Sequence, residues 1–388
     1  MNSLYNHISI HAAPDASIPA SSLLPSCSSF SWETENHLHL LGRTYDQAGD
    51  LKNNRIALVP RHFPMKLEIQ KETAVSAAAK YEFAGMCILG LHSPIMVDGV
   101  NERGLMGALL HYPGYAVYDL LPDSSRASSR TDIHPAFLVG YLLSQCSCVK
   151  EIANQLSRLN LTGETIMGQE MKVHYMFSDT TGEAVIIEPD RNGISIHRNN
   201  IGVMTNSPDY LWHKTNLRNY TAVTNHHSPA RPFLNTGISF FGECQGGGFG
   251  LPGDYSSPSR FVRLAVQKHY AVKGKDEIDG VSRMFHVFSC VDTPEGILME
   301  DNPMDPKKPF SYEQTLCISA MCAESGTYYF STAANRRISA VRLNQACQTA
   351  SKHAAAKESP DARKAQPPKI QYFNLQEKQD ISFLNGNG

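Results

Sequence analysis

Apolar positions along the chain fall into short runs separated by turn-forming residues. From Cys27 onward, β-branched, aromatic and aliphatic residues cluster in segments bounded by Gly, Asn and Asp, a pattern typical of strands. The turn-rich segment 47–54 divides two of these runs, and the turn-like segment 98–104 divides two others. The pattern predicts strands over 27–33, 37–46, 55–63, 87–93 and 105–113.

In three segments the apolar residues recur at helical spacing instead. The strongest signal covers Asp132–Leu159, with Pro135 suited to a first turn and a break near Ser147. Two further helices are predicted, one beginning at Ser257-Pro258 and one over 278–291. Between and after them lie a predicted hairpin over 173–190, a strand-rich block over 314–343 and a last short strand over 369–375.

Strands joined by hairpin turns, with helices between the strand-rich blocks, predict an α+β protein whose antiparallel sheets carry helices on their outer faces. Residues 1–26 are rich in Ala, Ser and Pro and show no clear period, so they are interpreted as a leader or pro-peptide. Residues 27–388 are predicted to form a single domain. The polar Ala/Lys/Pro-rich segment 348–368 is interpreted as a surface insertion.

Composition excludes some classes of function. The 388 residues include 35 basic and 37 acidic side chains, a net charge of −2, which excludes nucleic-acid binding through bulk positive charge. No apolar run approaches the roughly 18–20 residues of a membrane-spanning helix. A secretory signal peptide begins with a positively charged region, and the first 26 residues contain no Lys or Arg. A cytoplasmic protein is therefore expected.

Two motifs that could suggest a bound group are weak. The nine cysteines are dispersed without metal-ligand spacing, which favours free thiols over a disulfide framework or a metal site. The glycine-rich segment 246–254 lacks the Gly-Lys-Ser/Thr ending of a phosphate loop and is interpreted as a flexible loop.

Cys27 is the residue with the most specific chemical context. If the chain were cut before it, one residue would carry both a thiol and an α-amino group, which titrates near pH ~8 and can take the thiol's proton. This is the logic of an N-terminal nucleophile. A nearby Arg would favour the thiolate and a nearby Asp would orient the ammonium, and Gly42-Arg43-Thr44-Tyr45-Asp46 follows closely.

Downstream motifs strengthen this hypothesis. They are CSSFSW with GRTYD, VNERGLMGALLHYPG, VMTNSPDYLWHKTNLRNY, GLPGDYSSPSRFVR and TYYFSTAANRRISAV. In order and approximate spacing, the chain from Cys27 to Leu343 resembles the choloylglycine hydrolases, the family of bile salt hydrolases and penicillin V acylases. The resemblance implies a four-layer αββα sandwich and hydrolysis of a linear amide by an N-terminal cysteine, without a metal or organic cofactor.

The resemblance also implies a role for each matching residue. Cys27 would be the nucleophile, with Arg43 beside its thiolate and Asp46 accepting from its α-ammonium. Asn206 would supply a side-chain N–H to the oxyanion, and Arg260 would close the polar network around the nucleophile. For Arg263 and Arg336 a structural role is preferred.

Three departures from the family pattern bear on function. Family members tend to carry Asn or Tyr where this chain has His111, a position whose main-chain N–H serves the oxyanion and whose side chain touches the substrate. Thr44 stands where Asn is common. Ser26 rather than an initiator Met precedes Cys27, so activity would require cleavage between them, and autoproteolysis by the Cys27 thiol is the natural hypothesis.

The substrate is therefore expected to be a small amide with a large apolar acyl group: a conjugated bile salt first, penicillin V second. An N-acyl homoserine lactone is the alternative within the enzyme class. A rival from another class is an unprocessed relative that binds amphipathic ligands without hydrolysing them. The long segment 209–250, with His226, His227 and Phe240-Phe241, resembles the family's subunit-joining loop and predicts a homotetramer.

Overall fold

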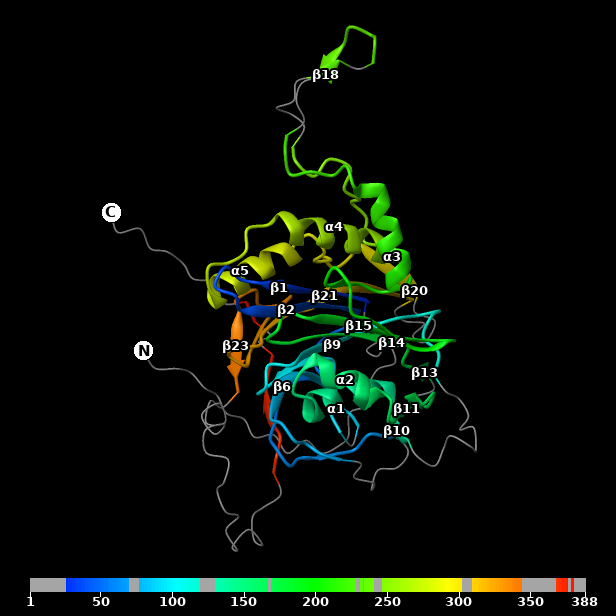
Figure 1. Cartoon of the computed structure of the whole chain (residues 1–388), viewed down its shortest axis with the longest axis vertical. Coiled ribbons are helices and arrows are strands. Elements are labelled where there is room, and N and C mark those ends of the chain that lie inside the picture. Colours follow the sequence, from blue (N-terminus) through cyan, green and yellow to red (C-terminus); the bar gives the residue numbers. More distant parts are fainter. Residues whose placement is uncertain are drawn as a thin grey trace, which may run out of the picture.

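The structure is a computed structural model that describes residues 26–69, 77–91, 93–118, 130–166, 169–227, 231–232, 234–240, 246–301, 309–343, 368–375 and 378–379. Four layers follow one another in Figure 1: helices, a sheet, a second sheet and again helices. The predicted leader, apart from the main chain of Ser26, and nearly all of the predicted insertion lie outside the described residues. The predicted αββα architecture is confirmed.

The first sheet carries the candidate nucleophile. All its ladders are antiparallel, and its strands run in the order β17-β1-β2-β21-β22-β23, with β20 also paired to β21. Their bounds are β1 Ser26–Glu33, β2 His39–Ala48, β17 Val203–Met204, β20 Leu298–Asp301, β21 Phe310–Cys322, β22 Thr327–Thr332 and β23 Ser339–Arg342.

The second sheet packs face to face against the first and is also antiparallel throughout. Its strand order is β16-β15-β14-β9-β8-β6-β3-β24, with β7 paired to β6. The bounds are β3 Asn54–Val59, β6 Phe83–Ile88, β7 Ile95–Met96, β8 Asp98–Asn101, β9 Met106–His111, β14 Val173–Ser178, β15 Ala184–Asp190, β16 Gly193–His197 and β24 Gln371–Phe373.

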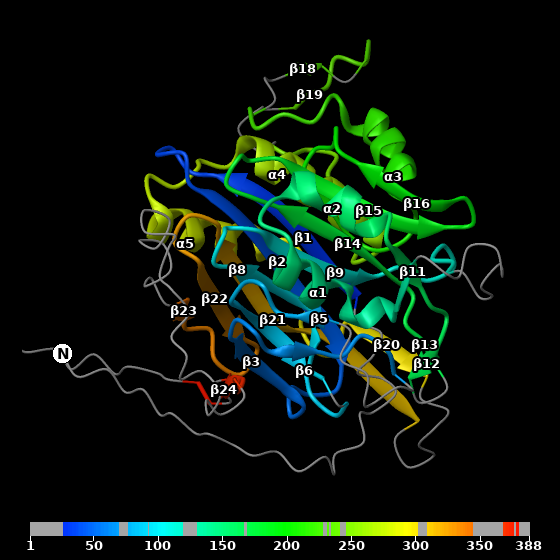
Figure 2. The same cartoon turned by 60° about the horizontal axis from the view of Figure 1, so that its bottom comes forward.

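Helices cover the outer face of each sheet. Helices α4 (Ser257–Tyr270) and α5 (Glu277–Phe288) pack on β1, β2 and β21, while α1 (Leu138–Gln145) packs on β8 and β9. Figure 2 shows α1 and its neighbour α2 (Val149–Leu156) in front of β14, β9 and β8. The remaining elements are η2 Pro135–Phe137, α3 Tyr210–Asn216, η3 Leu217–Tyr220 and the short pairs β4 Pro64–Met65 with β5 Ala77–Ala78, β10 Thr131–Ile133 with β11 Leu159–Leu161, β12 Thr165–Ile166 with β13 Gln169–Glu170, and β18 Arg231–Pro232 with β19 Ser239–Phe240.

The two later helices, the break near Ser147 and the 173–190 hairpin are confirmed, and the helical region predicted over Asp132–Leu159 is confirmed in its interior, whereas its two ends lie in β10 (Thr131–Ile133) and β11 (Leu159–Leu161). Three local predictions are wrong. The strand predicted over 55–63 ends at Val59, because Pro60 has no N–H for the ladder. The strand predicted over 87–93 instead spans Phe83–Ile88. Asp98 begins strand β8 rather than a turn, and the turn follows at Gly104, where φ is +87°.

Gly42 on β2 allows helix α5 to approach the first sheet closely. A Cβ at this position would collide with Met284 and Phe288, two buried side chains of α5. Phe288 in turn packs its ring 4.7 Å from that of Phe30 on β1. Apolar packing on this outer face and between the sheets therefore fixes β1 and β2 rigidly beneath the site.

The segment between Asn206 and Arg260 extends away from the body of the molecule. Its β18–β19 hairpin projects beyond the outer helices in Figure 1. Large apolar side chains are exposed on it and near its base, with Leu234 75% exposed, Ile238 55% and Phe249 78%. Among the described residues no helix is both long and apolar enough to cross a membrane.

Candidate active site

Cys27 is the second residue of β1, and its nitrogen forms the peptide bond to Ser26. Antiparallel pairing places it opposite Tyr45 on β2, and β17 on its other side leads to Asn206. Its main-chain N–H donates to Asn206 Oδ1 at 3.1 Å. The residue has no exposed surface, so in the uncut chain no substrate can reach the sulfur.

Arg43 contacts the sulfur directly. Its Nη2 donates to Cys27 Sγ at 3.0 Å, and its guanidinium group is fully buried, with Cζ 4.7 Å from the centre of the Tyr45 ring. The Nε and Nη1 atoms have no hydrogen-bond acceptor among the described residues. Asp98 supplies the compensating charge, since its Oδ2 lies 3.6 Å from Arg43 Nη1.

Asp98 is a site residue that the sequence did not reveal. It belongs to the second sheet and reaches across to Arg43 while accepting from Ser319 Oγ at 2.7 Å and Tyr328 OH at 2.8 Å. The segment DGVNERG has the residue composition of a turn, so the sequence did not predict that Asp98 would contact Arg43. Only the packing of the two sheets places this carboxylate beside the arginine.

The electrostatics of the uncut chain keep the candidate nucleophile Cys27 protonated. Burial raises the pKa of the Cys27 thiol to about 11, although the Arg43 charge opposes the shift. Removing the leader would add an α-ammonium to the same residue. A positive charge so close favours the thiolate and would lower the thiol pKa.

Asp46 lies two residues beyond Thr44 and is also buried. Its Oδ2 accepts from Thr44 Oγ1 at 3.0 Å and its Oδ1 from Thr315 Oγ1 at 2.7 Å. Thr44 Oγ1 also accepts from the main-chain N–H of Ser28 at 3.0 Å, so this departure from the family pattern links Asp46 to β1. Burial raises the pKa of Asp46 to about 6.

Arg260 joins the other polar groups around Cys27. It lies in the first turns of α4 and donates from Nη1 to Cys27 O and Ser28 Oγ, each at 2.7 Å. Its Nη2 donates to Asn206 Oδ1 at 2.6 Å, and its Nε to Tyr255 O at 3.0 Å. The fork of a single guanidinium thus holds both the main chain of Cys27 and the Asn206 amide.

Asn206 connects Cys27 to His111. Its Nδ2 donates to His111 O at 2.8 Å, at the end of β9. In the uncut chain this amide therefore contacts a carbonyl, whereas the resemblance assigns its N–H to an oxyanion. His213 Nε2 lies 3.0 Å from Asn206 O, which fixes the main chain here. Burial lowers the pKa of His111 to about 4, so its imidazole is neutral at physiological pH.

The structure thus brings all six predicted residues into one connected group, namely Cys27, Arg43, Asp46, His111, Asn206 and Arg260. The structural roles preferred for two other arginines are also observed. Arg263 donates to the carbonyls of Pro252, Asp254 and Cys290, and Arg336 pairs with Asp292 at 2.7 Å. The seven described cysteines are free thiols.

Comparison with known proteins agrees with this geometry. The sequence profile of the linear amide C–N hydrolases, choloylglycine hydrolase family, matches residues 27–352. The chain belongs to this family. The match begins at Cys27, the residue that the structure places at the centre of the buried polar group.

Individual relatives cover nearly the same part of the chain. A bile salt hydrolase/transferase of Clostridium perfringens is 31% identical over 323 residues, 82% of this chain and 93% of the relative. A protein of the same description from Lactiplantibacillus plantarum is 30% identical over 321 residues, 82% and 92% of the two chains.

Solved structures show the same fold. A mutant of the conjugated bile acid hydrolase from Clostridium perfringens superposes with a TM-score of 0.75 at 28% identity, covering 92% of this chain and all of the other. Penicillin V acylase from Agrobacterium tumefaciens matches with a TM-score of 0.61 at 20% identity over 82% of this chain and 86% of its own, and shows the fold alone. This choloylglycine hydrolase family member is an amidohydrolase.

Proposed function

We propose that this chain cleaves its own Ser26–Cys27 bond and then deconjugates bile salts, with Cys27 as nucleophile. The observation that carries the proposal is the buried group around Cys27. Arg43 donates to the sulfur at 3.0 Å, and Asn206 and Arg260 hold the nitrogen and carbonyl of the same residue at 3.1 and 2.7 Å. Such convergence of fixed polar groups on one thiol suits nucleophilic catalysis.

The first step is release of the leader. The sulfur of Cys27 attacks the carbonyl carbon of Ser26, the C–N bond between the two residues breaks, and the thiol proton ends on the nitrogen. Water then hydrolyses the thioester, which leaves a carboxylate on the leader and restores the thiol. Full burial of Cys27 and its thiol pKa of about 11 in the uncut chain support the proposal that cleavage precedes turnover.

In the second step the freed α-amine takes the thiol proton as sulfur attacks the substrate amide. The Asn206 N–H and the main-chain N–H at position 111 stabilise the oxyanion, and one such donor lowers a barrier by roughly 2.7–4 kcal/mol. The ammonium protonates the leaving nitrogen, and water hydrolyses the thioester to the free acid. Asp46, ionised above its pKa of about 6, orients the ammonium.

Conjugated bile salts are the first substrate class because the relatives described as bile salt hydrolase/transferase cover most of the chain. Penicillin V is the second, in keeping with the fold shared with a penicillin V acylase. N-acyl homoserine lactones are the third. His111 presents a neutral imidazole where the substrate is expected, so this side chain is proposed to set the preference among them.

The projecting β18–β19 hairpin supports the proposal of a homotetramer. Leu234 and Ile238 are 75% and 55% exposed on it, as expected for an arm that packs on another subunit. Sedimentation of the purified protein at micromolar concentration should give the tetramer mass. A monomer would refute this part of the proposal.

The deciding experiment combines intact mass with amine release. The purified protein should have a mass beginning at Cys27 and should release glycine or taurine from conjugated bile salts, measured with ninhydrin. Cys27→Ala should keep residues 1–26 and release nothing, whereas Cys87→Ala, at another fully buried thiol, should be processed and release the amine.

The other outcomes separate the alternatives. A processed protein that releases no glycine or taurine would move the proposal to penicillin V and acyl homoserine lactones. An uncut, inactive protein would instead support a non-catalytic relative that binds amphipathic ligands.

A further inference from the structure

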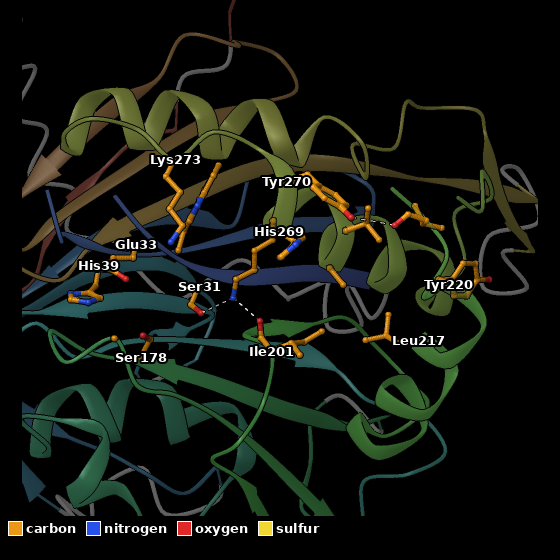
Figure 3. Close-up of a pocket in the computed structure, with 16 residues that line it drawn as sticks. Ser31, Glu33, His39, Ser178, Ile201, Leu217, Tyr220, His269, Tyr270 and Lys273 are labelled. Carbon is orange, nitrogen blue, oxygen red and sulfur yellow. Dashed lines mark hydrogen bonds between the residues drawn. The ribbon is translucent and has the colours of Figure 1, made fainter. Parts of the chain in front are cut away.

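A groove of about 770 Å³ lies between α4, the segment from α3 to Val223, and the far end of β1. Its volume is within the range of ordinary small-molecule sites, about 300–1,000 Å³. Figure 3 shows side chains from several elements around it, with Ile201 and Leu217 on one side and His269 and Tyr270 on the other. None of the six candidate catalytic and substrate residues lines it.

One wall carries an unsatisfied hydrogen-bond donor. Trp32, near the end of β1, is 5% exposed and lines the groove. Its indole N–H has no acceptor among the described residues. A buried donor without a partner costs about 1–3 kcal/mol. The nitrogen itself is covered, so a ligand acceptor satisfies it once the groove wall shifts to admit the ligand.

The same groove holds a cation without a matching acid. Lys268 Nζ donates to Ile201 O at 2.6 Å, Gly202 O at 3.2 Å and Ser31 Oγ at 3.4 Å, all neutral acceptors. Among the described residues it forms no salt bridge, and burial, with Lys273 nearby, lowers its pKa to about 8.

The remaining lining residues combine apolar surface with further positive charge. Leu217, Val223 and Ala265 contribute apolar side chains, and Lys273 adds a second ammonium. Glu33 is the acidic residue of the lining: its carboxylate contacts His37 at 2.5 Å, and this hydrogen bond, together with the Lys273 charge, lowers its pKa and keeps it ionised. Two ammonium groups therefore face one carboxylate. The balance favours a ligand with an apolar body and a negative charge.

We propose that this groove binds an amphipathic organic anion, with its carboxylate or sulfonate toward Lys268 and Trp32 Nε1 and its hydrocarbon body along the apolar wall. The site is separate from the reaction centre. Trp32 and Cys27 share β1, and five residues of strand separate their Cα atoms by about 17 Å. The proposal does not depend on hydrolysis.

Trp32 itself provides the assay. The chain has two tryptophans, and the other, Trp212, is 44% exposed on α3, so Trp212→Phe leaves Trp32 as the single reporter. Decanoate, which has no amide to cleave, is titrated into this variant at pH 7 below its micelle concentration. We expect a saturable change in Trp32 fluorescence, and the neutral decanol should bind at least about tenfold more weakly.

Substitutions then locate the site. Lys268→Met should weaken decanoate binding at least about tenfold. Lys273→Met, at an exposed position of the lining, should weaken it about two- to fivefold. Lys275→Met, an exposed lysine outside the lining, is the matched control and should bind as the parent does.

Each contrary result overturns the proposal. Equal binding of decanol would exclude an anion site, and equal losses in the Lys273 and Lys275 variants would place the anion elsewhere. The Lys273 variant keeps the test valid even if Lys268→Met disturbs the 201–202 turn. Absence of a saturable Trp32 signal at millimolar decanoate would exclude the groove as a binding site.

Discussion

Replacing Arg260 with Met should lower both the stability of the fold and the reactivity at Cys27, and comparison with a matched variant separates the two effects. Arg260 is 4% exposed and donates to Cys27 O, Ser28 Oγ and Asn206 Oδ1 within 2.7 Å. Methionine fills much of the same volume but removes all of these hydrogen bonds, and Asn206 Oδ1 keeps only the donor from the Cys27 N–H. Removing one member of a buried charged group costs about 3–5 kcal/mol, a large part of the ~5–15 kcal/mol that holds a domain folded.

Arg263→Met is the matched control. Arg263 lies three residues further along α4, is 7% exposed, and donates to Pro252 O, Asp254 O and Cys290 O without touching Cys27 or Asn206. Urea unfolding should show losses of similar size in the two variants, because each removes three or four hydrogen bonds of a buried guanidinium.

The two variants should differ in chemistry. In the Arg260 variant the carbonyl of Cys27 and the amide of Asn206 are free to shift, and misplacement of about 1 Å lowers kcat by about 100-fold. Intact mass measured over time should show slowed loss of residues 1–26, and any processed protein should turn over slowly. The Arg263 variant should process and turn over normally at temperatures where it is folded. Wild-type processing in the Arg260 variant would refute the assigned role.

Three further predictions follow from the same site. Asp98→Asn leaves the buried Arg43 charge without its counter-ion and should lower the free energy of unfolding by about 3–5 kcal/mol in urea titrations; an unchanged midpoint would show that the 3.6 Å pair contributes nothing. In a pH profile of kcat/KM, protonation of Asp46 should remove activity on the acid side. Its pKa of about 6 applies to the uncut chain and a neighbouring α-ammonium lowers it, so the midpoint should lie at or below pH 6, and one above 6.5 would contradict the assignment. His111→Asn and His111→Tyr should process normally but change the ratio of kcat/KM for a conjugated bile salt and penicillin V by about 10-fold or more, since the Asn206 contact uses the main-chain carbonyl and survives; an unchanged ratio would place the substrate elsewhere.

Local pattern was sufficient for most of the secondary structure. Short apolar runs bounded by turn-forming residues predicted β1, β2 and β9, and helical spacing predicted α1, α2, α4 and α5. At one position the local prediction failed because of tertiary packing. Gly99 has the sequence context of a turn but lies in β8, where a Cβ would collide with the Ala84 carbonyl of the neighbouring strand. A close approach between strands requires glycine just as a turn does, and the sequence does not distinguish the two.

At the candidate site, too, sequence motifs determined some features and tertiary structure determined others. The motifs supplied the chemical identity of Cys27, Arg43, Asp46, Asn206 and Arg260, and their order along the chain. Residue type and motif spacing are properties of the sequence alone, and they are sufficient to indicate an N-terminal nucleophile.

The tertiary structure decided which groups face one another. Cys27 and Asn206 are 179 residues apart in sequence, and they meet only because β17 pairs with β1 at the edge of the first sheet. Asp98 reaches Arg43 because the second sheet packs face to face on the first. The groove at Trp32 and Lys268 likewise combines a strand, a helix and a turn. Such contacts depend on sheet order and layer packing, which are set by burial summed over the whole chain, so no local segment of the sequence encodes them.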